Sequence, residues 1–140
     1  MPDTDAIRET NKQTLRRAMD AIGALDVDAV LGELHDDMLL QLPYEEHVPD
    51  LDKAGFGELF KVMFTMYKQF DIAITDVFDL VDPNHLIARY DGDCIGRDKD
   101  VRYANRYVGI FRFADGKITL WCEYDNPVTT LKSLEDFAAE

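Results

Sequence analysis

The sequence predicts a single α+β domain spanning residues 1–140, with helices in the first half of the chain and an antiparallel sheet in the second. Apolar residues recur at helical spacing up to about residue 67, and from about residue 70 to 125 they alternate as strands do, with turn residues between the runs. A chain of 140 residues is the usual size of one domain with one core. Because the helices precede a meander, we expect them to cover one face of the sheet.

The N-terminal region predicts two helices separated by a short break. The first covers residues 4–22, with its opening threonine as the expected N-cap, and Gly23 ends it. The second begins after Asp26 or Asp28, because either aspartate can accept hydrogen bonds from the first turn, and it ends near His35.

A short strand, a loop and a third helix follow. The apolar run 38–42 predicts a strand that Pro43 ends, and residues 44–52 are polar and typical of a loop. Residues 54–67 have helical spacing with apolar side chains around most of the helix, so this helix must be covered or must face an apolar cavity.

Four strands and a closing helix complete the chain. The strands are separated by turn sequences that include an Asp-Gly step, and they cover residues 71–80, 85–95, 101–113 and 118–125. Asn126 and Pro127 supply an N-cap and a first-turn proline for the final helix.

Composition excludes several classes of partner and location. The formal net charge of −13 repels a phosphate backbone or an anionic membrane, so we expect neither nucleic acid nor a membrane as partner. No apolar run approaches the length of a spanning helix, and the acidic start does not resemble a signal peptide. The two cysteines, Cys94 and Cys122, form no C-x-x-C motif, and as small strand hydrophobes they suit the reducing cytoplasm.

The helix-break-helix over 21–37 and the long run over 107–127 resemble the SnoaL-like branch of the nuclear-transport-factor-like superfamily. The resemblance covers nearly the whole chain. It implies a cone-shaped fold, in which a curved antiparallel sheet wraps around three N-terminal helices and a short helix ends the chain. The superfamily includes ketosteroid isomerases, polyketide cyclases, limonene-type epoxide hydrolases, dehydratases, phenazine-biosynthesis proteins and binding modules without catalysis, so the fold alone does not decide the function.

The ketosteroid-isomerase comparison excludes that mechanism in its usual form. The base and the two oxyanion donors of those enzymes align with Leu42, Ala18 and Gly109, none of which transfers a proton. Trp121 matches an aromatic residue that lines the pocket of that family, which favours a cavity here.

The epoxide-hydrolase comparison implies a catalytic set of Arg89, Asp91 and Glu123. The Arg89-Tyr90-Asp91 run matches the Arg-x-Asp of that family, and Glu123 stands where its second aspartate does. One acid would activate water, the other would protonate an oxygen, and the arginine would orient both. We expect the three side chains to converge inside the cavity, with one acid protonated near neutrality. The alternative is a salt-bridged strand surface. On the strand before Pro43, only Gln41 is able to help hold the water.

A third comparison, with phenazine-biosynthesis proteins, again includes Glu123. It also includes the Asp82-Pro83-Asn84-His85 run and the Asp91-Gly92 step, but the helix histidine of those proteins aligns here with Leu59.

The walls of the expected cavity are aromatic. We expect four residues to bind substrate, although on this fold the same helix face also forms the core: Phe60, Phe64, Tyr107 and Trp121. The Tyr44-Glu45-Glu46-His47 run holds metal-competent side chains, but no second ligand cluster has a usable spacing, so we predict a solvated loop and no metal.

These observations favour a cofactor-free hydrolase, lyase or isomerase that acts by general acid–base chemistry on a small apolar molecule of polyketide, terpenoid or steroid type. The alternatives are a ligand-binding module without catalysis and a protein-interaction module. Alternation leaves apolar residues such as Val108, Ile110 and Leu120 on the sheet face opposite the helices, so we expect a homodimer through the sheet.

Overall fold

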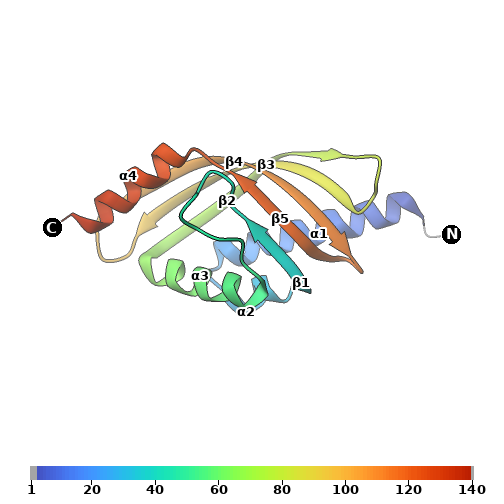
Figure 1. The fold of residues 1–140 in the computed structure, drawn as a ribbon, viewed down its shortest axis with the longest axis horizontal. Helices are drawn as coiled ribbons and strands as arrows, with labels where there is room; N and C mark the ends of the chain where they lie inside the picture. The colour runs from blue at the N-terminus through green and yellow to red at the C-terminus, as the bar shows by residue number, and fades with distance from the viewer. Residues whose placement is uncertain (1–2, 140) are drawn as a thin grey trace.

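The computed structural model describes residues 3–139 as four helices and a five-stranded sheet (Figure 1). In chain order the elements are α1 (Thr4–Gly23), α2 (Val27–Leu31), β1 (Leu34–Gln41), α3 (Lys53–Met66), β2 (Tyr67–Asp79), β3 (His85–Gly96), β4 (Arg102–Ala114), β5 (Lys117–Tyr124) and α4 (Pro127–Ala138). This order confirms the predicted α+β class. In the described part of the chain, no helix is both long enough and apolar enough to cross a membrane.

The sheet is a meander with one strand added at its edge. Its order is β1-β5-β4-β3-β2, and the pairs from β2 to β5 are antiparallel as predicted. β1 lies parallel to β5, so a strand from the first third of the chain pairs with the last strand. Figure 1 shows α1 lying along the sheet, with α3 and α4 toward one end of it.

Side-chain caps define the starts of all four helices. Asp3 caps α1 one residue before the predicted Thr4, and Asp26 caps α2 by accepting a hydrogen bond from the Ala29 amide. Asp52 caps α3, and Asn126 caps α4 in the predicted manner. Each of these caps satisfies an amide that the helix itself leaves without a partner.

Two strands begin earlier than predicted. α2 ends at Leu31, and β1 starts at Leu34, so His35 lies in a strand rather than at a helix end. Pairing of Leu34 with Ile118 extends this strand beyond its apolar run. β2 follows α3 directly. Because the pairing register shifts between Tyr67 and Gln69, both Tyr67 and Phe70 point into the core and are buried.

Alternation assigns the two faces of the sheet as predicted for β4 and β5. Tyr107, Phe111 and Trp121 point toward the helices and are almost fully buried, whereas Val108 and Ile110 lie on the outer face. The core therefore sits between the inner face of the sheet and helices α1 and α3.

Gly109 on β4 allows aromatic side chains to close over that strand. A Cβ atom at this position would stand 2.4 Å from the ring of Phe111 and 2.8 Å from the hydroxyl oxygen of Tyr90. Both neighbours are buried, so neither ring has room to move aside.

We therefore predict that Gly109→Ala lowers the free energy of unfolding by about 1–3 kcal/mol, as an overpacked core does. Urea denaturation measures this change. Gly23→Ala is the matched control, because the nearest atom to a Cβ there is 4.0 Å away, and it should leave stability unchanged or slightly higher. Equal stability of the Gly109→Ala variant and the parent would contradict this packing.

Candidate active site

A cavity of about 260 Å³ opens between the inner face of the sheet, helices α1, α3 and α4, and the loop after β1. Of the four predicted wall residues, Phe60, Tyr107 and Trp121 line it. Phe64 does not line the cavity. It lies one layer behind, where its ring meets that of Phe60 edge-on at 5.7 Å and so supports the wall.

Glu123 is the acid that the sheet directs into this cavity. Its Oε1 accepts hydrogen bonds from the Tyr90 hydroxyl at 2.5 Å and from the Trp121 indole Nε1 at 3.3 Å. Tyr90 comes from β3 and Glu123 from β5, so this contact spans β4 between them. Among the described residues no hydrogen bond engages the remaining oxygen, Oε2, and Glu123 lines the cavity.

The surroundings of Glu123 favour its neutral form. Burial raises its pKa to about 7, and the nearby Asp125 charge acts in the same direction, while the hydrogen bonds from Tyr90 and Trp121 oppose the shift. Burial and the Glu123 charge together raise the pKa of Tyr90 well above its usual value, so Tyr90 stays a proton donor. A pKa of about 7 places the titration of the Glu123 carboxyl near neutral pH, and its main cause is burial rather than the predicted neighbours Arg89 and Asp91.

A second acid, Glu45, lies in the loop after β1. The run around it was predicted to be solvated, and Tyr44 is indeed 56% exposed, but Glu45 is only 8% exposed and lines the cavity. Burial raises its pKa to about 7, and the neighbouring Asp125 carboxyl adds to the shift. The prediction of a solvated loop is wrong for this residue, because the loop turns its side chain into the cavity that α4 also lines.

A chain of hydroxyl groups leads to Asp125. The Tyr103 hydroxyl accepts hydrogen bonds from Tyr107 at 2.9 Å and from Asn105 Nδ2 at 2.8 Å. Its own proton is therefore directed to Thr130 Oγ1 at 3.3 Å, and Thr130 in turn donates to Asp125 Oδ2 at 2.9 Å. The chain of donors ends on a carboxylate.

Arg89 and Asp91 do not reach the cavity. Both lie on the outer face of β3, where the Arg89 side chain is 59% exposed and 3.8 Å from Asp76. The expected convergence with Glu123 is therefore wrong. Residues two apart share a strand face, but on β3 the inward face belongs to Tyr90 and the other even-numbered residues.

Two other features that the sequence comparisons singled out have structural contacts outside the cavity. The Gln41 amide donates to Asp50 Oδ2 at 3.2 Å and does not line the cavity. In the turn before β3, the side chain of Asn84 accepts a hydrogen bond from Asn11 of α1, so the Asp82-Pro83-Asn84-His85 run holds the helix and the sheet together.

Sequence reasoning missed Tyr90 and Glu45 as site residues. For Tyr90 a signal was present, because Leu86, Ala88 and Cys94 are apolar and lie an even number of residues away, on the same face of β3. For Glu45 there was none, since a loop has no periodicity that reports burial.

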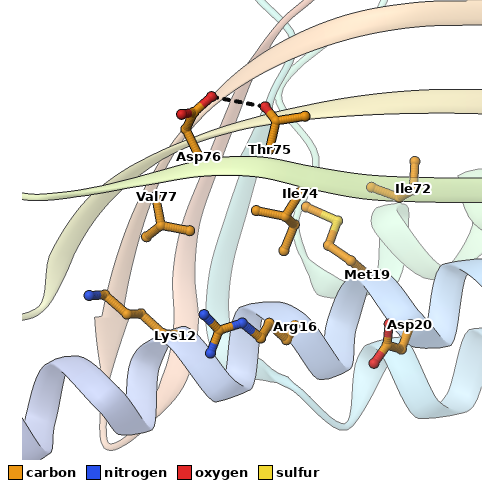
Figure 2. A pocket seen from close by; sticks show the side chains of 9 residues that line it. All are labelled: Lys12, Arg16, Met19, Asp20, Ile72, Ile74, Thr75, Asp76 and Val77. Atoms are coloured by element: carbon orange, nitrogen blue, oxygen red, sulfur yellow. Dashed lines mark hydrogen bonds between the residues drawn. The ribbon is translucent and has the colours of Figure 1, made fainter.

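A second hollow of about 490 Å³ lies between α1 and β2 (Figure 2). It is an open groove that carries Lys12 and Arg16 from α1 and Asp76 from β2. Lys12 also pairs with Asp79 at 2.8 Å, and no buried acid faces the groove. In the described residues, no group of three or more His, Cys, Asp or Glu side chains is placed to hold a metal ion. Of the two hollows, the Glu123 cavity is the one lined by a buried acid among the described residues.

The pKa of Glu123 makes a prediction about stability. The folded-state pKa of about 7 lies above the ordinary value of 4.5. The protonated carboxyl therefore contributes its full share to the free energy of unfolding below about pH 4.5, and this share is lost as pH rises through 7. Glu123→Gln should therefore gain stability relative to the parent by about 2 kcal/mol between pH 5 and pH 8, measured by urea denaturation. The exposed Asp91→Asn is the control and should show no such trend. A difference between Glu123→Gln and the parent that is independent of pH would contradict the assignment.

Several solved structures share this fold. A phenazine biosynthesis-related protein from Pseudomonas aeruginosa superposes with a TM-score of 0.81 at 22% identity, over 95% of this chain and 90% of its own. An epoxide hydrolase from M. tuberculosis, described as LEH-like, gives 0.73 at 20% identity, over 94% of each chain. A pinacolase from Penicillium brevicompactum gives 0.83 at 16% identity, over 96% of this chain and 94% of its own. At these identities the likeness concerns the fold.

The sequence itself identifies the family. No curated protein matches it significantly. The family model of the SnoaL-like domain matches residues 15–121, which is most of the chain and includes β3, β4 and the start of β5. The resemblance inferred from the sequence is confirmed, and the chain belongs to the SnoaL-like domain family.

Proposed function

We propose that this protein is a cofactor-free enzyme that performs general acid–base chemistry on a small, largely apolar molecule of polyketide, terpenoid or steroid type, as a hydrolase, lyase or isomerase. The observation that carries the proposal is Glu123, a carboxyl held in an aromatic cavity with a pKa of about 7. Acids and bases whose pKa lies near the working pH transfer protons most effectively. Membership of the SnoaL-like family supports an enzyme of this general type.

In this proposal Tyr90 and Trp121 hold one oxygen of Glu123, and the other oxygen exchanges the proton with the substrate. The two donors bind the ionised form more strongly, so they stabilise the carboxylate once its proton has left. Phe60 and Tyr107 form apolar walls that keep a hydrophobic substrate in place, and Phe64 supports Phe60 from behind.

The competing proposal is a ligand-binding module that keeps the cavity and performs no reaction. It would use the same walls, and Glu123 would serve only as a hydrogen-bonding group. The two proposals differ in one measurable respect: loss of the Glu123 proton abolishes turnover in an enzyme, and in a binding module it changes affinity alone.

We predict that Glu123→Gln lowers the turnover number by about 10²-fold or more, the usual contribution of a positioned acid or base. The substrate for this test is any compound that the parent protein converts in a screen of apolar epoxides, ketones and diols. Arg89→Ala and Asp91→Asn are the controls, and they should retain parental turnover because their side chains face outward. Parental turnover by Glu123→Gln would refute the acid–base role, and a parent that binds these compounds without converting any would favour the binding module.

We also propose a homodimer through the outer face of the sheet. Val108 is 40% exposed there, and Ile110 and Leu120 beside it are half-buried, so the face presents apolar area that the helices do not cover.

The cysteines Cys94 and Cys122 are both free and buried, which supports the cytoplasm as the location.

Sedimentation velocity at micromolar concentration should give the mass of a dimer. Val108→Arg should shift that mass to the monomer, because a second positive charge directly opposite Arg89 on β3 would have to be buried in the apolar interface. Glu58→Gln, an exposed change on α3, should leave the dimer intact. A monomeric parent protein would overturn this arrangement.

A further inference from the structure

Several hydrogen-bond donors of the cavity are directed to its own acids. The Tyr90 hydroxyl and the Trp121 indole donate to Glu123. The hydroxyl chain that starts at Tyr107 runs toward Asp125. These donors are engaged within the protein, and the ionised carboxyl groups offer acceptor oxygens to a ligand.

The charges around the cavity have one sign. Three carboxyl groups line it, those of Glu45, Glu123 and Asp125, and none of the described residues that line it is a lysine or an arginine. His47 is the one lining side chain there that is able to carry a positive charge. It sits at the rim, 67% exposed, and its Nδ1 lies 4.0 Å from Glu45 Oε2.

Glu45 adds an independent sign of an incomplete site. Its side chain is nine-tenths buried, yet no hydrogen-bond donor of the described protein reaches its Oε1. A buried oxygen without a donor costs free energy unless a shared proton or a ligand supplies one. A ligand that brings a hydrogen-bond donor would meet that need.

We propose that the cavity takes a lipophilic organic cation, an apolar skeleton that ends in a protonated amine. An ammonium group supplies several donors together with a positive charge, and both match what the carboxyl groups lack. The rings of Tyr90 and Tyr107, stacked at 5.3 Å, and that of Trp121 add aromatic surface that attracts a cation. A carboxylate ligand meets only repulsion, and an alcohol offers a single donor and no charge.

This inference rests on the proposed function, since it names the ligand class of the same cavity. When Glu123 protonates a neutral substrate, the product of that step is itself a cation within these walls. The arrangement that binds an amine therefore also stabilises the charge that general acid catalysis creates.

The test uses three probes with one apolar cage: 1-adamantylamine, 1-adamantanol and 1-adamantanecarboxylate. Isothermal titration calorimetry near pH 7.5 measures their affinities. We expect the amine to bind at least tenfold more tightly than the alcohol, and the carboxylate to bind most weakly. An alcohol or a carboxylate that binds as tightly as the amine would overturn the proposal.

Variants separate the carboxyl charges from the shape of the cavity. Glu45→Gln should weaken amine binding at least fivefold and leave alcohol binding within twofold, whereas Glu46→Gln, the exposed neighbour, should change neither. Asp125→Asn provides the same comparison if Glu45→Gln does not fold. Equal losses for amine and alcohol, or no loss for either, would contradict a role of the carboxyl charges. Since these measurements do not involve turnover, a failed acid–base role of Glu123 leaves their outcome unaffected, and a failed amine preference leaves the turnover test intact.

Discussion

The hydrogen bond from Tyr90 to Glu123 joins two strands that are not neighbours, and the site depends on it. β4 lies between them, so the two backbones are about two strand spacings apart, near 10 Å. The tyrosine reaches the carboxyl because Gly109, the partner of Glu123 on β4, has no side chain to occupy the space between. One glycine thus permits a contact that places an acid, its donor and an aromatic wall on the same inner face.

The hydrogen-bond donors around this contact point to carboxyl groups, and no lysine or arginine is among the described residues that line the cavity. Tyr90 and Trp121 direct their protons to Glu123, and the chain through Tyr103 ends on Asp125. Each donor lowers the free energy of an ionised carboxyl, while burial raises it, and for Glu123 burial has the larger effect. The acid therefore holds its proton near neutral pH and can still release it, which is the property that proton transfer to a substrate requires.

The sequence predicted the helices and strands, and it predicted which side chains of β4 and β5 point toward the helices. It failed on β3, where a motif resemblance and the apolar alternation indicate opposite faces. On β4 and β5 the apolar alternation predicts which side chains face the helices, and it places Tyr107 and Trp121 correctly. On β3 the resemblance of Arg89-Tyr90-Asp91 to a catalytic motif predicts the wrong face for the charged pair, whereas the alternation of Leu86, Ala88, Tyr90 and Cys94 gives the observed one. The local period was the better guide, because a strand next to a core is oriented by its apolar side chains.

Glu45 shows the limit of local reasoning. The loop that carries it is polar and contains prolines, and its neighbours Tyr44 and Glu46 are exposed. It lines the cavity together with Asp125, just after β5, and Thr130 on α4, which lie about eighty residues further along the chain. Only the assembled fold brings these groups together.

The clustering of acids also bears on why the cavity has this composition. Burial raises the pKa of both Glu45 and Glu123 to about 7, so ionisation of either carboxyl lowers the stability of the fold. A hydrophobic side chain of similar size at either position would avoid that cost. Packing alone therefore does not account for two such groups in one aromatic cavity, whereas proton transfer to a bound molecule, or neutralisation by a cationic one, uses the properties that make them costly.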